Sequence, residues 1–377
     1  MSIFQLSSLV ANLPDRKQKL FQRIYDLDSL PGRLKLVSGV REWTAKRFGS
    51  VEEVEKQKIV RITNLITGEG ALFNHLRGKR PVDVHQDRDL DALVDSYRQG
   101  CPFCSPQERT PADVFGRIEG DYCTTAANVA KYDGFHSLVI PREHHPLKFN
   151  QAMVEDYFRV AARWFIEASR YAAKEGDSGV YYPFLMWNCL WPAGSSVVHG
   201  HLQLTLTRGR HYPKIDWLRR CSLSYQREYG SNYFKDLYDV HSCLGLGWSR
   251  DVARYMSILT PIKEKETWII MPGELRLERL VSAGRSVFGV LECLKEKAAL
   301  NSFNVVLYLP PLNEGVQGWS DFPLIARMVD RGSVFSRTAD VGAMELYATS
   351  VISSDPFAVA QLLHPPITQR WVPGTKR

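Results

Sequence analysis

The sequence has no long hydrophobic run, and its cysteines are too few and too scattered for a disulfide framework. No apolar stretch among the 377 residues approaches the ~20 residues that a membrane-spanning helix needs. The segment Met1–Leu6 has neither the basic residues nor the cleavage site of a secretory signal. Seven cysteines, an odd number, favour reduced thiols with one metal-binding pair over disulfides. These absences together predict a cytoplasmic protein without a membrane span.

The sequence also has no long run of charges of one sign. The chain has 48 Lys and Arg against 41 Asp and Glu, a net charge of +7, and the basic residues are spread along it. This spread argues against a nucleic-acid surface, although a mild positive excess suits small anionic substrates. A hydrophobic content of 44% is ample for a core, and the length predicts two domains or a double core.

The most informative motif is His199-Gly-His201-Leu-Gln203, set among valines and leucines that are typical of a strand. Alternation places the two histidines and the glutamine on one face of this predicted strand. A small-residue turn, Pro192–Ser196, precedes it, and its backbone amides can approach an anion closely. The combination indicates a nucleophile, a metal ligand and a hydrogen-bond donor to phosphate. A surface strand with two solvated histidines is the alternative.

A second motif, Cys101-Pro-Phe-Cys104, predicts half of a metal site. Zinc prefers four nitrogen and sulfur ligands, so two histidines must come from elsewhere. His199 is one candidate, and the adjacent His144 and His145, which follow a predicted strand, compete for the other place. A redox-active pair fits less well, because Pro106 and polar residues follow where a helix would lower a thiol pKa.

A compact cationic loop, Arg77-Gly-Lys79-Arg80, suits a polyphosphate, because guanidinium groups bind phosphate oxygens through paired hydrogen bonds. A solvated basic turn is the alternative. The loop closes a stretch, residues 64–81, that resembles the opening segment of galactose-1-phosphate uridylyltransferases, where N-P-L-T-G-E leads to R-A-K-R-P. The cysteine pair, the later histidine and the H-x-H-x-Q motif follow in that family's order over roughly residues 60 to 210.

The resemblance implies a role for each matching residue. His201 would be the nucleophile that becomes nucleotidylated, and Gln203 would hydrogen-bond the phosphoryl oxygens of that intermediate. The substrate-binding residues that it implies are Arg77, Arg80, Phe103, Asn128, Asn188 and Ser196. The structural zinc ligands that it implies are Cys101, Cys104, His144 and His199.

The family belongs to the histidine-triad superfamily, together with nucleotide-sugar and dinucleoside-polyphosphate phosphorylases. The activity implied here is transfer of a nucleoside monophosphate from a UDP-hexose-like nucleotide sugar to a sugar 1-phosphate, as in galactose metabolism. A phosphorylase, which uses inorganic phosphate as the acceptor, is the alternative. A non-catalytic nucleotide-binding protein is the alternative from another class. No nucleic-acid or membrane partner is expected, and a homodimer is compatible with the resemblance without being required by the residues.

The predicted fold class is α+β, with two histidine-triad-like halves that each have an antiparallel sheet flanked by helices. The second half is predicted to be degenerate, because the strand expected at Ser320–Arg327 contains no histidine. A helix is predicted over residues 150–175. The predicted units are a helical extension at 1–55, the catalytic half at 56–215 and the degenerate half at 216–377. Val341–Glu345 resembles a family segment that reaches the sugar phosphate, with one extra residue that puts hexose recognition in doubt.

Overall fold

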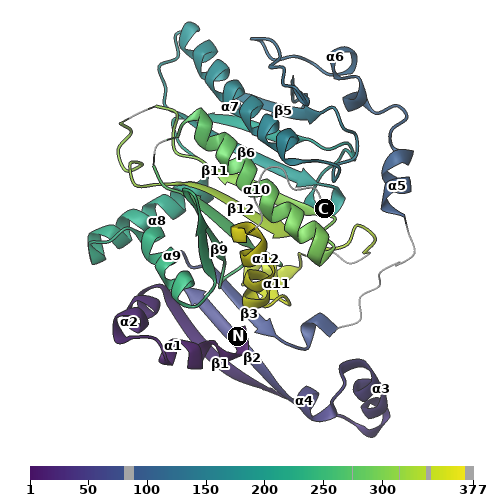
Figure 1. Ribbon diagram of the computed structural model, residues 1–377, viewed down its shortest axis with the longest axis vertical. Coiled ribbons are helices and arrows are strands. Elements are labelled where there is room, and N and C mark those ends of the chain that lie inside the picture. Colours follow the sequence, from purple (N-terminus) through teal and green to yellow (C-terminus); the bar gives the residue numbers. More distant parts are fainter. Residues whose placement is uncertain (80–88, 274, 314, 337–340, 370–377) are drawn as a thin grey trace.

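A nine-stranded antiparallel sheet forms the centre of the molecule (Figure 1). The computed structural model describes residues 1–79, 89–273, 275–313, 315–336 and 341–369. The strands run in the order β4-β5-β7-β6-β11-β12-β10-β9-β8. Their bounds are β4 Cys123–Ala127, β5 Phe135–Pro141, β6 Tyr181–Cys189, β7 Leu202–Arg208, β8 Gly247–Arg250, β9 Ala253–Ser257, β10 Thr267–Met271, β11 Phe303–Tyr308 and β12 Leu324–Asp330.

Two equivalent halves meet edge to edge in this sheet. The first half has the strand order β4-β5-β7-β6 and the second has β9-β10-β12-β11, so that β6 and β11 pair at the centre. One long helix follows the second strand of each half: α7 (Gln151–Lys174) follows β5, and α10 (Leu277–Ala298) follows β10. These two helices pack together on one face of the sheet (Figure 1). The predicted α+β fold with two related halves is confirmed.

The pairing register identifies the second-half counterparts of the histidine motif. Val139 of β5 pairs with Leu202 of β7, and Ile270 of β10 pairs with Ile325 of β12. The two pairs coincide when the halves are aligned on the prolines at the ends of β5 and β10. On this alignment, His199, His201 and Gln203 correspond to three buried apolar residues, Phe322, Leu324 and Ala326. The second half has the same strands without these polar side chains.

The predicted helix over residues 150–175 is confirmed as α7. The side chain of Asn150 accepts a hydrogen bond from the backbone N–H of Met153 and so caps the first turn. Residues at helical spacing then form an apolar stripe that is buried on the sheet, including Val154, Tyr157, Phe158, Ala161, Phe165 and Ala168. This aromatic stripe is core, as its period indicates.

A smaller sheet, in the order β1-β2-β3-β13, lies below the central one in Figure 1. Its strands are β1 Tyr25–Arg33, β2 Lys56–Asn64, β3 Gly70–Asn74 and β13 Ser350–Ile352. The prediction that residues 1–55 are helical is therefore wrong for Tyr25–Arg33, which pairs with β2 along its whole length. The helical spacing of Leu20, Ile24 and Leu27 carries less weight than this cross-strand pairing, which is a tertiary interaction.

A buried ion network joins the two sheets. Arg327 of β12 donates from Nε to Glu266 at 2.7 Å and from Nη1 to Glu69, in the loop between β2 and β3, at 2.9 Å. The guanidinium also lies over the ring of Trp268. Because Arg327 and Glu266 are almost fully buried, each needs the other to offset the cost of desolvation.

The remaining helices are short or surround the sheets, and within the described ranges none combines the length and hydrophobicity that a membrane crossing requires. The α-helices are α1 Leu6–Ala11, α2 Asp15–Ile24, α3 Ser38–Phe48, α4 Val51–Glu55, α5 Leu90–Ser96, α6 Pro106–Arg109, α8 Pro213–Tyr229, α9 Tyr233–Cys243, α11 Ala343–Tyr347 and α12 Pro356–Gln369. The 3-10 helices are η1 Ile3–Gln5, η2 Arg77–Lys79, η3 Pro102–Cys104 and η4 Trp191–Ala193.

Candidate active site and metal centre

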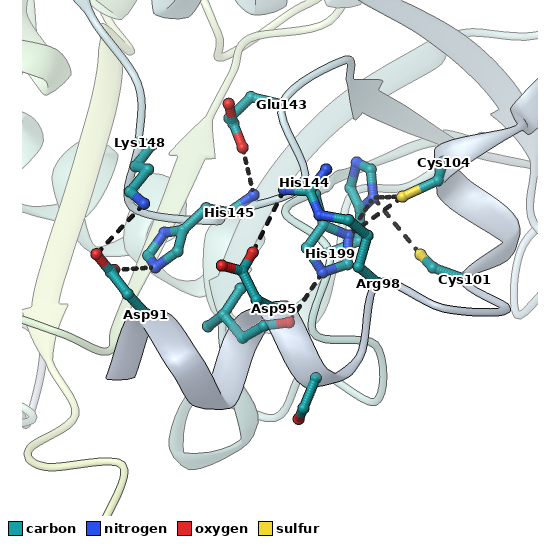
Figure 2. Close-up of polar contacts among 12 residues, drawn as sticks. Asp91, Asp95, Arg98, Cys101, Cys104, Glu143, His144, His145, Lys148 and His199 are labelled. Atoms are coloured by element: carbon teal, nitrogen blue, oxygen red, sulfur yellow. Dashed lines mark hydrogen bonds and ion pairs between the residues drawn. The ribbon is translucent and has the colours of Figure 1, made fainter. Parts of the chain in front are cut away.

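Four predicted metal ligands meet beside η3, as Figure 2 shows. The ligand atoms of Cys101, Cys104, His144 and His199 all lie within 4.8 Å of one another. Cys104 Sγ is 3.3 Å from His144 Nδ1 and 3.5 Å from His199 Nδ1, and the two Nδ1 atoms are 3.2 Å apart. A tetrahedral zinc ion with ordinary bond lengths places such donor atoms roughly 3.3–3.6 Å apart. The four side chains therefore fit one tetrahedral metal ion.

Backbone carbonyls hold the outer ring nitrogens of both histidines. His144 Nε2 lies 3.1 Å from the carbonyl oxygen of Val94 in α5, and His199 Nε2 lies 2.8 Å from that of Pro141. When Nε2–H donates to a carbonyl, the Nδ1 lone pair is left facing the cysteines, which is the tautomer that a metal requires. Burial lowers the pKa of His199 to about 4, so the ring stays neutral.

The neighbouring His145 faces away from the cluster. Its Nδ1 accepts a hydrogen bond from the N–H of Leu147 at 3.2 Å, and its Nε2 lies 2.9 Å from a carboxylate oxygen of Asp91 (Figure 2). Both ring nitrogens are thus engaged elsewhere. Of the two adjacent histidines, the structure brings His144 to the cysteines.

His201 lies beside the cluster without being part of it. Its Nδ1 is 3.0 Å from the carbonyl oxygen of His199, so Nδ1–H donates there and Nε2 keeps its lone pair. The ring of Phe103 packs edge-on against both histidine rings, with centroids 5.9 Å from His199 and 5.2 Å from His201. Burial lowers the pKa of His201, which favours the neutral imidazole.

The two histidines precede β7 rather than lie within it, which corrects the predicted strand. The ladder with β5 reaches only Leu202, and Gly200 instead donates its N–H to the carbonyl oxygen of His144 at 3.3 Å. A Cβ on Gly200 would lie 3.1 Å from Cα of Pro146. Glycine therefore lets this segment approach the loop that carries His144, and the close approach replaces the regular ladder.

Gln203 belongs to a polar network on the sheet face opposite α7. Its Oε1 accepts a hydrogen bond from the hydroxyl of Tyr132 at 3.1 Å and lies 3.1 Å from His136 Nε2. Asn128 Nδ2 is 3.1 Å from the same ring nitrogen. The predicted residues Gln203 and Asn128 are thus linked through His136, which the sequence reading missed. His136 pairs with Thr205, which is two residues beyond Gln203 and therefore on the same face of the sheet. The alternation of β5 was thus the signal that could have identified His136.

Asn188 lies at the same face, near the end of β6. Met186 pairs with Gln203, so Asn188, two residues further along β6, faces the same side of the sheet as Gln203. Ser196 is exposed in the turn between η4 and the histidines. The structure therefore places Asn188 on the face of Gln203, and Ser196 in the connection that leads from β6 to His201.

The predicted basic loop follows the smaller sheet. Arg80 is outside the described residues, and Arg77 lies in η2 after β3, on the smaller sheet. Burial would raise the pKa of Glu345, but N–H groups of the backbone and the charges of Lys263 and Arg77 lower it. Among the described residues, no hydrogen bond or ion pair joins Arg77 to the histidines.

Known proteins resemble this chain more in structure than in sequence. No protein-family model matches it. A curated protein of Archaeoglobus fulgidus, described only as uncharacterized, is 24% identical over 163 residues, which are 41% of this chain and 47% of that protein. The chain therefore spans about half the length of the curated relative that it matches.

Solved structures match over a much larger share of the chain. An ADP-glucose phosphorylase from Arabidopsis thaliana, with bound ADP-glucose, superposes with a TM-score of 0.59 at 14% identity, over 80% of this chain and 97% of that one. A uridylyltransferase superposes with a TM-score of 0.54 at 16% identity, over 80% of this chain and 96% of that one. The chain has the uridylyltransferase fold. The predicted resemblance is confirmed at the level of the fold.

Proposed function

We propose that the chain is a nucleotidyltransferase that moves a nucleoside monophosphate from a nucleotide sugar to a sugar 1-phosphate through a nucleotidyl-His201 intermediate. The observation that carries this proposal is the state of His201. Its Nδ1 is committed to the carbonyl oxygen of His199, and the ring lies outside the metal cluster. A neutral imidazole with a free Nε2 lone pair is a competent nucleophile.

The reaction then consists of two displacements at the α-phosphorus. In the first, the Nε2 lone pair of His201 forms a bond to phosphorus, and the sugar 1-phosphate leaves with the electrons of the broken P–O bond. In the second, a phosphate oxygen of the acceptor attacks phosphorus and the N–P electrons return to Nε2. The proton on Nδ1 stays on the hydrogen bond to His199 throughout, so neither step needs an external base.

Fixed hydrogen-bond donors supply the stabilisation of the transferring phosphoryl group in this proposal. The carbonyl oxygen of Gln203 is occupied by Tyr132, which leaves its amide NH2 for a phosphoryl oxygen. Ser196 and the backbone amides of its turn are the second source of donors. Arg77 and Arg80 are proposed to bind the outer phosphates, and Phe103 and Asn128 to line the nucleoside pocket.

The Cys101, Cys104, His144 and His199 cluster is proposed to bind a structural zinc ion. The donor distances fit a tetrahedral ion, and all four protein ligands together leave no open position for substrate. The metal would supply structural stability and no chemistry. It would fix His199, whose carbonyl oxygen in turn fixes the ring of His201.

A phosphorylase is the second candidate. The ADP-glucose phosphorylase superposes on this chain with a higher TM-score than the uridylyltransferase does. Both activities share the covalent step and differ only in the acceptor. The test is a panel of UDP- and ADP-sugars with purified protein, scoring exchange of labelled sugar 1-phosphate against incorporation of labelled orthophosphate. Both activities exchange labelled sugar 1-phosphate through the reversible first step, so orthophosphate decides between them. Incorporation of orthophosphate supports the phosphorylase, and exchange of the sugar phosphate without it supports the transferase. Inactivity on the whole panel would favour the non-catalytic alternative.

A further inference from the structure

Asn304 of β11 lies on the second half and reaches into the site of the first. It pairs with Asn188 across the central β6–β11 ladder, and its Nδ2 donates to Asn188 Oδ1 at 2.8 Å. The same Nδ2 donates to the carbonyl oxygen of Ala193 at 2.8 Å, in the turn that leads to Ser196. Arg331, just beyond β12, donates from Nη1 to Asn304 Oδ1 at 2.6 Å.

These contacts fix the orientation of the Asn304 amide from both ends. A guanidinium group only donates hydrogen bonds, so the atom that faces Arg331 must be the Asn304 oxygen. A backbone carbonyl only accepts, so the atom that faces Ala193 must be the Asn304 nitrogen. The two requirements agree with each other. They leave Asn304 no other orientation in which all three contacts are satisfied.

The orientation of Asn188 follows from that of Asn304. Since Asn304 Nδ2 faces Asn188, the Asn188 oxygen must accept, and the Asn188 NH2 group is turned away from β11. Among the described residues, the Asn188 Nδ2 atom has no hydrogen-bond partner. β7 lies on the other side of β6 from β11, and His199 and His201 lead directly into β7, so the Asn188 NH2 group is turned toward the strand that follows His201.

We infer that Asn304, held by Arg331, is a positioning residue that turns the Asn188 amide so that its NH2 group faces the phosphoryl group handled by His201. This inference rests on the proposed function only for the identity of the group that Asn188 faces, a phosphoryl group. The degenerate second half thus has a specific task in the site of the first half. With the amide reversed, an Asn188 oxygen would face the phosphoryl oxygens and repel them.

Asn304→Asp tests the inference, because a carboxylate keeps the contact with Arg331 and loses both donated hydrogen bonds. The Asn188 NH2 group is then expected to turn toward residue 304. The affinity for UMP or AMP, and the rate of labelling by an α-³²P nucleotide sugar, should fall roughly 10- to 100-fold, the range for one hydrogen bond to a charged group. Asn313→Asp is the matched control. Within the described part of the chain, the side chain of Asn313 acts as an acceptor only, from the N–H of Tyr181, so this variant should behave as wild type.

A double-mutant cycle separates positioning from a general loss of structure. In an Asn188→Ala background, Asn304→Asp should cost less than 3-fold, since the side chain through which it acts is gone. Asn304→Ser, which adds no charge, should give a smaller loss that also vanishes in that background. Melting temperature and metal content of each variant report on folding. Equal losses with and without Asn188 would overturn the inference.

The two readouts separate this inference from the proposed function. Labelled wild-type protein together with an unaffected Asn304→Asp variant would overturn the inference and leave the function standing. Absence of label with UDP- and ADP-sugars, together with nucleotide binding that depends on Asn304 only when Asn188 is present, would support the inference and overturn the function. Absence of both label and nucleotide binding would overturn both.

Discussion

Replacing Cys104 distinguishes a metal ligand from an ordinary surface thiol. Cys104 is exposed, so in the absence of metal its truncation to alanine should change stability by no more than ~0.5 kcal/mol. Four-ligand structural zinc sites contribute ~10–16 kcal/mol in small zinc domains, which is ~3 kcal/mol for each ligand. Loss of the thiolate–zinc bond, and not loss of side-chain packing, should therefore account for most of the destabilisation by Cys104→Ala.

The size of the cooperative unit converts this free energy into a melting temperature. Both halves share one sheet and one core, and at ~2.1 cal/mol/K per residue over 377 residues 1 kcal/mol corresponds to ~1–1.5 °C, so Cys104→Ala should lower Tm by ~3–5 °C. Calorimetry with and without a chelator, together with elemental analysis, measures both consequences. The chelator should lower the Tm of wild type by more than it lowers that of Cys104→Ala, because the three remaining ligands of that variant bind zinc more weakly.

Cys243→Ala is the control, because Cys243 is also a free thiol and lies outside the cluster. It should keep its zinc and its response to the chelator. Wild-type zinc content in Cys104→Ala, or the same small change of Tm in both cysteine variants, would refute the four-ligand site.

Three further predictions concern other parts of the molecule. Arg77→Ala should slow nucleotidyl transfer by roughly 10²-fold with an unchanged Tm, as expected for a charged donor to the substrate's outer phosphates. An unchanged rate would mean that the loop is a solvated basic turn. Arg327→Leu should lower the free energy of unfolding by ~3–5 kcal/mol in urea, because it leaves Glu266 buried and unpaired, and adding Glu266→Gln should recover part of this loss. Burial lowers the pKa of His241 to about 4, below the ~6.5 of an unfolded histidine, so its contribution is complete above about pH 6.5 and is lost as the pH falls toward 4. His241→Gln should remove up to ~3 kcal/mol of that pH dependence, and equal slopes of stability against pH in the two proteins would contradict the assignment.

The metal cluster could be predicted because its ligands lie in short motifs with characteristic spacing. Cys101 and Cys104 are three residues apart, and the histidines stand at the ends of strands whose apolar alternation is visible in the sequence. The choice between His144 and His145 was left open, since adjacent residues differ only in the direction of their side chains. The structure decides it through Asp91 and Leu147, which engage His145.

The parts that could not be predicted depend on long-range pairing. Asn304 has no local motif, and its place beside Asn188 follows only from the β6–β11 ladder, which joins residues more than a hundred positions apart. The strand Tyr25–Arg33 was misread as helix because its apolar residues also fit a helical spacing, and β2 alone settles its conformation. The role of Arg77 in binding phosphate stays a prediction, because its motif says nothing of the smaller sheet that it follows.

The most direct test of the central claim is to trap the covalent intermediate. The full-length protein is incubated with UDP-glucose or ADP-glucose labelled with ³²P in the α-phosphate, then denatured and digested for mass spectrometry. A nucleotidyl group on His201, stable to base and labile to acid, is the predicted result. It should be absent from His201→Ala, which should keep its zinc, whereas His199→Ala should lose zinc. Label that persists in His201→Ala, or that resides on another residue, would contradict the account.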